Sequence, residues 1–311
     1  MAVVVVGNVF VDIKGFPDGA YIPAGRNSGQ VVTMHGGVGR NIAEDIANLE
    51  LHPKFVSMVD ESDQGRQVVE HLRSRGVNTD YVAVSPEGMG IWLAVFDAAG
   101  DIAASISHRP EMDDMVRMME EKGDEIFADA DSILVEIDND RAVVEQVFRF
   151  AEKYGKKVYA VVANMSIAVE RRDFLKSAEC TVCNVQEADI LFAKDYSHLT
   201  TEQLRRELLG DIRKAGIPAQ VVTLGENGAV YAEQSGNTGY CPARSVHVRD
   251  TTGAGDAFFA GVAAGLTYGN DLGQAVAIGT RLASAVITVS DNVCPRFLPE
   301  ELGLIVENGV I

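Results

Sequence analysis

The sequence predicts an α/β fold, a three-layer α/β/α domain built on a mostly parallel central sheet, with a smaller β-sheet set apart from it. Two observations predict this architecture. After about residue 130, short apolar segments alternate with amphipathic segments of helical length, which is typical of a parallel sheet covered on both faces. Before residue 130, two β-rich stretches, roughly 14–34 and 88–108, interrupt a similar alternation of apolar and amphipathic segments. The 311 residues are 47% hydrophobic, which suffices for a sizeable core.

In the N-terminal part, strands and helices are distinguished by their apolar period. Ala2–Val6 is a β-branched run that ends in a Gly-Asn turn, so it predicts a buried strand. Apolar residues recur at helical spacing over Val38–Leu49, so a helix is expected directly after a pair of glycines. Phe55–Val59 predicts a further strand. Gln64–Arg75 predicts a helix that ends before Gly76, because glycine is favoured just after a helix.

The two β-rich stretches show little helical period. Residues 14–34 contain many Gly, Pro and Asn, which favours short extended pieces joined by turns. Residues 91–96 and 102–107 flank Asp-Ala-Ala-Gly-Asp, which predicts a β-hairpin with Gly100 in its turn. The two stretches together can form one small sheet outside the main layers.

Beyond residue 130 the alternation is regular. Thr200-x-x-Gln203 has the spacing of a capping box, and a glycine follows each of the two predicted helices, Arg141–Tyr154 and Thr201–Ala215. Parallel sheets of this kind bind ligands at the carboxyl ends of their strands. Residues 1–311 are expected to form a single domain, since no linker composition divides them. The predicted strands are Ser132–Ile137, Lys157–Val162, Cys180–Cys183 and Ala219–Leu224, and the helices are Arg141–Tyr154 and Thr201–Ala215.

The charge of the chain is unbalanced, with 27 basic against 45 acidic residues and a net charge of -18. Such a protein repels nucleic-acid backbones and anionic membrane surfaces at long range, so neither is an expected partner. A small anion such as ATP is not excluded, because a local cluster of backbone N–H groups or a bound cation can hold it.

Cysteine usage and the N-terminal residues bear on the compartment. Cys180 and Cys183 have redox or zinc spacing, but no second pair or suitably spaced histidines complete a zinc site, so two small residues in a buried strand are the favoured interpretation. Four cysteines in all fit a reducing cytosol. No basic region precedes the first apolar run, and the longest apolar stretch, Ala257–Leu266, is too short to span a bilayer. A cytoplasmic protein is therefore expected.

The most informative segment is Asp-Thr-Thr-Gly-Ala-Gly-Asp-Ala-Phe-Phe-Ala-Gly, residues 250–261. Its Gly-Ala-Gly run is conformationally permissive, and the apolar residues that follow predict a buried helix. A glycine turn that leads into a helix exposes free N–H groups and the positive end of the helix dipole, which predicts an anion site. Asp256 lies within this turn. By its place alone it is equally a helix cap or a catalytic base beside the anion site.

This segment closely resembles the C-terminal signature of the ribokinase-like carbohydrate kinases, the PfkB family. The resemblance implies a ribokinase-like fold and an ATP-dependent kinase of a small hydroxylated molecule. It also implies that Asp256 is the base and that the amides of Gly253, Ala254 and Gly255 form the anion hole. Phosphorylation of a hydroxyl needs both, because a proton must be removed and the charge of the transferring phosphoryl group must be stabilised.

A second match is Gly-Gly-Val-Gly-Arg-Asn-Ile-Ala at residues 36–43, which resembles the N-terminal signature of the family. The resemblance implies that Gly37 lets the backbone approach the substrate and that Asn41 binds its hydroxyls. Asp12, in a loop after the first strand, has the position of the family's sugar-binding aspartate. Asp138 falls where several sugar kinases hold a substrate-contacting acid. Taken alone, the 36–43 segment is more simply a glycine turn with an asparagine in the first helical turn.

Two further matches concern the nucleotide. Asn184-Val-Gln-Glu187 resembles the Asn-x-x-Glu of the family, which implies that Asn184 acts near the phosphates and Glu187 on the water shell of Mg²⁺. From the residues alone it is a helix start capped by the asparagine. Thr-Leu-Gly-Glu-Asn-Gly at 223–228 resembles the nucleotide-contacting turn, which implies contacts from Thr223, Gly225 and Gly228. Without the family, it predicts a hairpin turn.

A monovalent cation is a further implied ligand. Asp250 and the carbonyl of Thr252 match positions that often hold K⁺ in such enzymes. The other ligands would come from Ser290–Arg296, which departs from the small, glycine-rich pattern of the family and so puts activation by K⁺ in doubt. The adenine pocket is expected between this loop and the last helices.

In this family, β-rich segments such as 14–34 and 88–108 form a lid over the sugar, and two lids often pair. The resemblance therefore implies a homodimer through the lid, and a closure that excludes water from the site. His108 and Arg109 follow the second segment. Solvated surface residues are the ordinary interpretation of this pair, and contact with substrate or phosphate is the alternative.

The substrate is ranked by the form of the N-terminal signature. Gly-Gly-Val-Gly-Arg-Asn resembles the pseudouridine kinase branch most, whereas ribokinases more often have a lysine where Val38 lies. A pseudouridine-like nucleoside therefore ranks first and a free sugar such as ribose or fructose second, although the residues at 107–110 do not match that branch.

Other functional classes are tested by the same motifs. A dinucleotide-dependent oxidoreductase would need G-x-G-x-x-G after the first strand, and a P-loop kinase would need G-x-x-x-x-G-K-[ST]; the sequence has neither at the required place. A catalytically silent sugar-binding regulator would be expected to lose Asp256 or Glu187, and this chain keeps both.

Overall fold

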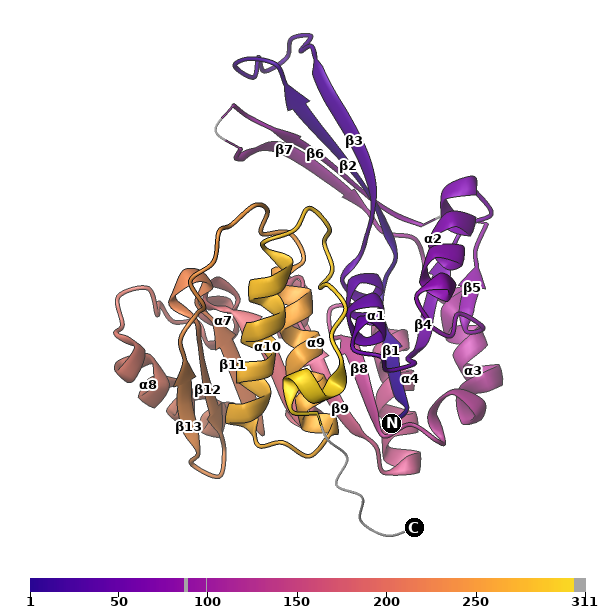
Figure 1. Cartoon of the computed structure of the whole chain (residues 1–311). Helices are drawn as coiled ribbons and strands as arrows, with labels where there is room; N and C mark the ends of the chain where they lie inside the picture. Colours follow the sequence, from indigo (N-terminus) through magenta and orange to yellow (C-terminus); the bar gives the residue numbers. More distant parts are fainter. Residues whose placement is uncertain (87–88, 99, 305–311) are drawn as a thin grey trace.

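The computed structural model describes residues 1–86, 89–98 and 100–304 (Figure 1). Residues 88 and 99 of the expected second lid segment, and residues 305–311 of the expected domain, lie outside the described residues. A layered α/β body carries a separate small sheet that rises from one edge (Figure 1). The fold class expected from the sequence is confirmed.

The body is built on a nine-stranded sheet whose order is β13-β12-β11-β10-β9-β8-β1-β4-β5. In this order, all neighbours from β11 through β10, β9, β8, β1 and β4 to β5 pair in parallel. Strands β12 and β13 extend the sheet beyond β11 as an antiparallel hairpin. The strands are β1 (Val3–Val6), β4 (Lys54–Val59), β5 (Val82–Val84), β8 (Ser132–Glu136), β9 (Lys157–Val161), β10 (Cys180–Asn184), β11 (Ala219–Thr223), β12 (Ala229–Glu233) and β13 (Thr238–Cys241).

Helices cover both faces of this sheet, which explains the continuous apolar run of β1. Val3 and Val5 belong to the core on one face, and Val4 and Val6 belong to the core on the other. The first face is covered by α1 (Val38–Asn48), α2 (Asp63–Ser74), α9 (Ala254–Thr267) and α10 (Leu272–Val286), and the second by α3 (Asp113–Phe127), α4 (Arg141–Tyr154), α5 (Met165–Ala168), α6 (Arg172–Ser177), α7 (Val185–Phe192) and α8 (Thr201–Ala215). Three short 3₁₀ turns are Val169–Arg171, Gly225–Asn227 and Pro299–Leu302.

Cys180 and Cys183 lie in β10, buried and without a disulfide. The two thiols face opposite cores, so they share no site. The interpretation as small buried strand residues is confirmed. Among the described residues, no helix is long and apolar enough to cross a membrane.

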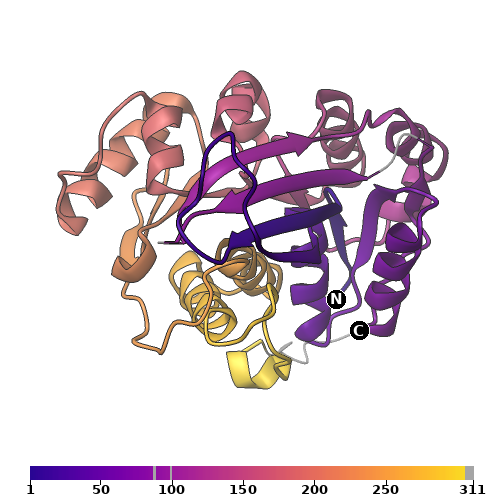
Figure 2. The ribbon, with the colours of Figure 1, turned by 90° about the horizontal axis from the view of Figure 1, so that it is seen from above.

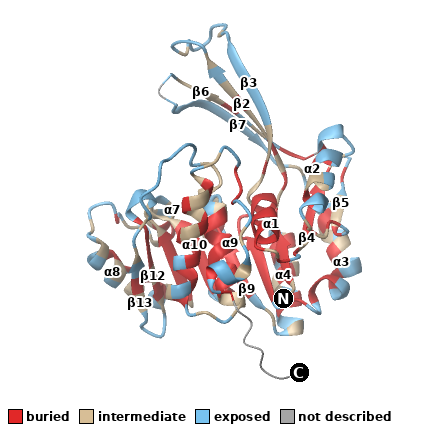
Figure 3. Cartoon of the chain, in the orientation of Figure 1, coloured by how far each residue is buried: buried red, intermediate tan, exposed pale blue. Residues whose placement is uncertain are grey.

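The small sheet has the order β3-β2-β6-β7, with β2 (Phe10–Pro17), β3 (Gly29–Gly36), β6 (Gly90–Phe96) and β7 (Ile102–His108). Seen from above, it lies across the top of the body (Figure 2). Its outer strands β3 and β7 are largely exposed and its inner strands β2 and β6 are mostly intermediate, in contrast to the mostly buried strands of the central sheet (Figure 3). The sheet begins at residue 10, so Asp12 lies within a strand and not in the expected loop.

The direction of strand order reverses at β1, which lies between β4 and β8. The chain runs from β1 through β4 to β5 on one side, then returns to β8 and continues on the other side. In open α/β sheets, ligands bind outside the carboxyl ends of the strands at such a switch point. The residues that follow β1 and β8 are therefore where a site is expected.

Candidate functional site

The N-terminus of α1 packs directly on the turn after β1. Gly37 caps the helix with φ +99°, and a Cβ there would lie 2.4 Å from the carbonyl oxygen of Asn8, so only glycine fits. The carboxylate of Glu136, the last residue of β8, ties the two together. It accepts hydrogen bonds from the backbone N–H of Asn8 (2.6 Å), the side-chain amide of Asn8 (2.8 Å) and the N–H of Gly39 (3.1 Å). This arrangement fixes α1 above the switch point.

Asp256 faces this helix from α9. The sequence predicts Asp256 within the glycine turn. In the structure Gly253 is the N-cap of α9 with φ +79°, so Asp256 is instead the third residue of the helix. Its Oδ2 accepts a hydrogen bond of 2.7 Å from the side-chain amide of Asn41. Two signatures that are 215 residues apart in the chain thus meet at one hydrogen bond.

The pKa of Asp256 is shifted toward neutrality. Burial raises it to about 7, against the hydrogen bond from Asn41 and with a further upward contribution from the charge of Asp12. A carboxyl with this pKa exchanges its proton near physiological pH, as general-base catalysis requires.

Asp12 completes this group from β2. A Cβ on Gly36 would lie 2.4 Å from its Oδ2, so the carboxylate rests against the glycine pair that precedes α1. Burial raises the pKa of Asp12, opposed by the charges of Lys14 and Arg40. Asp12, Gly37, Asn41 and Asp256, all expected from the sequence, are thus brought together.

Asp138 lies two residues beyond the end of β8 and is 3% exposed. Its Oδ1 accepts from the N–H of Ala163 (2.9 Å), and its Oδ2 forms an ion pair with Arg109 (3.2 Å). Arg109 also donates to the carbonyl of Asp138 (3.1 Å), and its guanidinium lies over the ring of Phe10. Arg109 therefore binds Asp138. Neither a solvated surface position nor a contact with substrate or phosphate, the two interpretations from the sequence, describes this ion pair.

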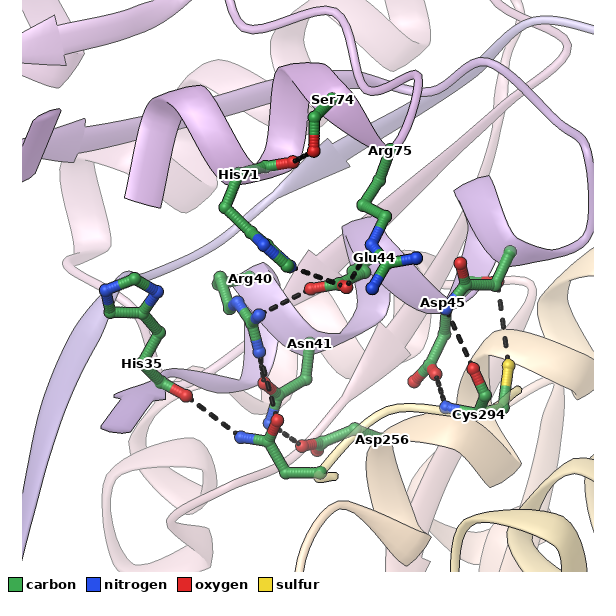
Figure 4. Close-up of polar contacts among 12 residues, drawn as sticks. His35, Arg40, Asn41, Glu44, Asp45, His71, Ser74, Arg75, Asp256 and Cys294 are labelled. Carbon is green, nitrogen blue, oxygen red and sulfur yellow. Dashed lines mark hydrogen bonds and ion pairs between the residues drawn. The ribbon is translucent and has the colours of Figure 1, made fainter. Parts of the chain in front are cut away.

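Helix α1 carries a row of buried polar residues (Figure 4). Arg40 donates from Nη1 to Oδ1 of Asn41 (2.9 Å) and to Oδ1 of Asn292 (3.1 Å), and its Nη2 binds the carboxylate of Glu44. Asn292 in turn donates to the carbonyl of His35 (3.0 Å). Arg40 thus orients the amide that holds Asp256.

Glu44 also contacts His71 of α2 and Arg75, which directly follows that helix. His71 Nε2 lies 2.8 Å and Arg75 Nε lies 3.4 Å from its Oε1 (Figure 4). The side chains of Arg40 and Glu44 are only 5% and 1% exposed, whereas Arg75 is 51% exposed. The pair formed by Arg40 and Glu44 is therefore the buried part of this network.

The loop after α10 is fastened to the same helix. Asp45 accepts from the N–H of Cys294 (2.6 Å), and Asn48 donates to its carbonyl (2.8 Å). Burial raises the pKa of Asp45 well above its usual value. A Cβ on Gly253 would lie 1.9 Å from the carbonyl oxygen of Asn292, so this loop also packs on the turn before α9.

A cavity of about 660 Å³ opens on the other side of the α9 N-terminus. Its size is that of a ligand pocket. Thr223, Gly225 and Gly228 line it as expected, and so do Ala254 and Gly255. Residues 243–246 and Val248 also line it, as does the face of α10 with Thr280, Ala283, Ser284 and Ile287. The pocket therefore lies beside the last helices as expected, but no residue of the 290–296 loop lines it, so the expected contribution of that loop is wrong.

Asn184 and Glu187 form a reciprocal capping box at the start of α7. Glu187 accepts from the N–H of Asn184 (2.7 Å), and Asn184 accepts from the N–H of Glu187 (2.8 Å). Burial raises the pKa of Glu187, and the charge of Asp138 adds to this effect. The capping interpretation is confirmed, and the carboxylate lies near enough to Asp138 for their charges to interact.

Asp250 accepts a hydrogen bond from the N–H of Thr252 (2.9 Å). Although burial acts to raise it, the pKa of Asp250 is held below its usual value by Thr252 and by the charge of Lys14. Within the described ranges, no group of three or more His, Cys, Asp or Glu side chains could hold a metal ion by itself. A metal here would need further ligands, such as backbone carbonyls, water or a bound nucleotide.

The arrangement can transfer an anionic group. A cavity of nucleotide size reaches the start of α9, and a carboxyl of near-neutral pKa lies three residues into that helix. A hydroxyl held by Asp12, Asn41 and Asp256 would face an anion bound at this helix start.

Known proteins share this sequence and architecture. A guanosine-inosine kinase of Exiguobacterium acetylicum is 33% identical over 296 residues, which cover 93% of this chain and 95% of that protein. A pseudouridine kinase of Escherichia coli (strain K12) is 23% identical over 287 residues, 92% and 90% of the two chains. The solved structure of Arabidopsis thaliana ribokinase complexed with ribose and ATP matches with a TM-score of 0.79 at 24% identity, over 97% of each chain.

The family model described as pfkB family carbohydrate kinase matches residues 2–293. The match includes both glycine signatures and all residues of the site described above except Cys294. The chain belongs to the PfkB family of carbohydrate and nucleoside kinases.

Proposed function

We propose that this protein transfers the γ-phosphoryl group of ATP to the hydroxymethyl group of a ribonucleoside, with Asp256 as the base. The hydrogen bond between Asn41 and Asp256 carries the proposal, because it joins the acceptor side of the site to the helix start that borders the nucleotide cavity.

The mechanism follows from this geometry. Asp12 and Asn41 hold the acceptor, and Asp256 takes the proton of the attacking hydroxyl. The amides of Gly253 to Asp256 stabilise charge on the transferring group, and ADP leaves into the cavity. Thr223, Gly225 and Gly228 contact the nucleotide.

A nucleoside is favoured over a free sugar by the face of the small sheet that carries Asp12. Side chains alternate along a strand, and Trp92 is the register partner of Asp12, so both lie on one face. Phe16 and Phe96 lie on the same face and stack with ring centroids 4.9 Å apart. A free sugar needs no aromatic platform, whereas a nucleobase stacks on one.

The choice among nucleosides rests on the relatives. The expected preference for pseudouridine has no support beyond the 23% identity to a pseudouridine kinase, and the guanosine-inosine kinase is more similar at 33%. A purine ribonucleoside is therefore our first candidate, with pseudouridine second and ribose or fructose after it.

Mg²⁺ and K⁺ are the implied metals. We assign Glu187, with Asn184, to the water shell of a nucleotide-bound Mg²⁺, which keeps several of its waters. Asp250 and the carbonyl of Thr252 are the residues for K⁺. The loop with Asn292 and Cys294 is bound to α1, which makes K⁺ the weaker of the two proposals.

The experiment that tests the function is a coupled ADP-release screen with guanosine, inosine, pseudouridine, adenosine, ribose and fructose as acceptors. Purine ribonucleosides are expected to give the highest kcat/KM. The absence of acceptor-dependent ADP release for every compound would exclude a nucleoside or sugar kinase, and a preference for ribose would replace the nucleoside with a free sugar.

Replacing Trp92 with alanine should raise KM for the nucleoside about 10-fold with kcat changed little, because stacking of a base on an aromatic ring is worth roughly 1–3 kcal/mol. Steady-state kinetics measure it. The control is Thr33→Ala, on the opposite face of the same sheet, which should leave KM unchanged. An equal KM in the Trp92 variant would remove the argument for a nucleobase on this face.

The pH dependence should report Asp256. Because its pKa is about 7 and the base acts unprotonated, kcat/KM should fall as the pH decreases below 7 and level off above about 8. A pH profile between 5.5 and 9 with saturating MgATP measures it. A profile that is flat across this range would contradict a base with this pKa.

The assembly is proposed to be a homodimer through the small sheet, which would act as a lid. The face turned away from Asp12 exposes Val31 (72%), Ile91 (41%), Leu93 (38%) and Ile106 (69%), an apolar surface that a second copy can cover. Sedimentation at micromolar concentration tests this, and a purely monomeric species would exclude it. We place the protein in the cytoplasm, consistent with its buried free thiols.

A further inference from the structure

Strand β2 of the small sheet carries a lysine whose ammonium group reaches the start of α9. Lys14 Nζ lies 3.5 Å from the hydroxyl oxygen of Thr252, which directly precedes the N-cap Gly253. Lys14 is only 7% exposed, although the sheet that carries it is largely open to solvent. The contact joins residues 238 positions apart, and it spans from the small sheet to the anion site.

Lys14 forms no ion pair with any described residue, whereas the other cations of the site do. Arg40 is bound by Glu44, and Arg109 is bound by Asp138. Throughout 1–86, 89–98 and 100–304, the long contact with the Thr252 hydroxyl is the sole hydrogen bond of the Lys14 ammonium, which has three donors, and no carboxylate lies within ion-pair distance of it. A buried and unpaired ammonium is unfavourable, so this group is suited to an anion that arrives with the ligand.

The surroundings of the anion site require such a cation. Asp12, Asp250 and Asp256 surround it, and the chain as a whole carries a net charge of -18. Helix α1 begins with the apolar Val38, and Arg40 in its first turn is already bound by Glu44. The charge of Lys14 acts on both Asp12 and Asp250, which places the ammonium between the acceptor side and the nucleotide side.

We propose that Lys14 is a catalytic residue that binds the transferring phosphoryl group. The contact of the small sheet with the start of α9 and the neutralisation of the phosphoryl charge then occur together. The inference rests on the proposed kinase function. In the step, the acceptor oxygen forms a bond to the γ-phosphorus as the bond to the β–γ bridging oxygen breaks. The proton of the acceptor goes to Asp256, the bridging electron pair leaves on ADP, and Lys14 stays protonated throughout.

The experiment compares Lys14→Met with Lys14→Arg and with Arg26→Met, which removes one charge from an exposed position between β2 and β3. Lys14→Met should lower kcat roughly 10²-fold, the typical effect of removing one donor from a developing anion. Lys14→Arg should recover part of this loss, and Arg26→Met should retain the kcat of the wild type. Lys14→Gln serves the same purpose if methionine perturbs the strand, as judged by circular dichroism.

A binding measurement separates this proposal from the proposed function. In calorimetry with Mg²⁺ and guanosine present, Lys14→Met should bind AMP-PNP about 10-fold more weakly and ADP as the wild type does, because only the γ-phosphoryl contact is lost. This readout needs no turnover, so it holds even if the acceptor screen fails. Equal losses for AMP-PNP and ADP, or an unchanged AMP-PNP affinity, or a kcat within threefold of the wild type, would overturn the role of Lys14.

Discussion

Asp256→Asn is expected to lower kcat by at least about 10², because general-base catalysis contributes roughly 10²–10⁴-fold and asparagine cannot accept the proton. The hydrogen bond from the Asn41 amide can be kept by the new carbonyl oxygen, so the acceptor should still bind. Single-turnover kinetics with MgATP measure the chemical step, and calorimetry measures the Kd of the acceptor. Retained turnover would exclude Asp256 as the base.

Stability provides the control for this variant. The pKa of Asp256 in the folded protein, about 7, lies above the unfolded value near 3.8, so folding favours the protonated form. The contribution of this carboxyl to stability is therefore full below pH 4 and is lost as the pH rises through 7. At pH 8 the asparagine variant should melt no lower than the wild type, and a lower Tm would mean that the loss of activity reflects damage to the fold.

Replacing Arg40 with methionine is expected to lower the free energy of unfolding by about 3 kcal/mol, because removal of one partner of a buried ion pair leaves the other charge poorly compensated. Thermal melting should show a decrease in Tm of roughly 6 °C for a chain of this size. KM for the acceptor should also rise, since Asn41 loses the guanidinium that orients its amide.

Two controls isolate this effect. Arg75→Met removes a second cation from the same carboxylate, but Arg75 is 51% exposed, so a loss of less than about 1 kcal/mol is expected. The double variant Arg40→Met with Glu44→Gln should be more stable than Arg40→Met alone, because the isolated charge is removed with its partner. Equal losses in the Arg40 and Arg75 variants would show that burial of the pair does not govern its contribution.

The parts of the fold and site that local pattern determines could be predicted from the sequence. The apolar run of β1, the capping box before α8 and the glycine after α4 are each local signals, and each predicts an element that the structure contains. Helix α3 also has a local signal, because Met115, Met119 and Ile126 are spaced for one buried face.

The parts that depend on contacts between distant segments could not be predicted. In the sequence, nothing distinguishes Lys14 as a site residue within its β-rich stretch. Only the register of the small sheet brings its ammonium group close to Thr252. Arg40 and Glu44 look like an exposed i, i+4 pair, and only the packing of α2 and of the Asn292 loop on α1 makes them buried. The commitment of Arg109 to Asp138 likewise depends on how β7 returns to the body.

The contact of Gly253 with the carbonyl of Asn292 has a consequence for how new specificities can arise on this scaffold. A Cβ on Gly253 would lie 1.9 Å from that carbonyl oxygen, so even a methyl group has no room there. The loop that supplies the carbonyl is held in turn by α1, so single substitutions cannot alter the phosphate end of the site without changing its shape. The small sheet has no such restriction in its outer strands β3 and β7, because most of their side chains are exposed to solvent. Divergence in acceptor choice should therefore accumulate in β2, β3, β6 and β7, and the reaction stays the same while its substrate changes.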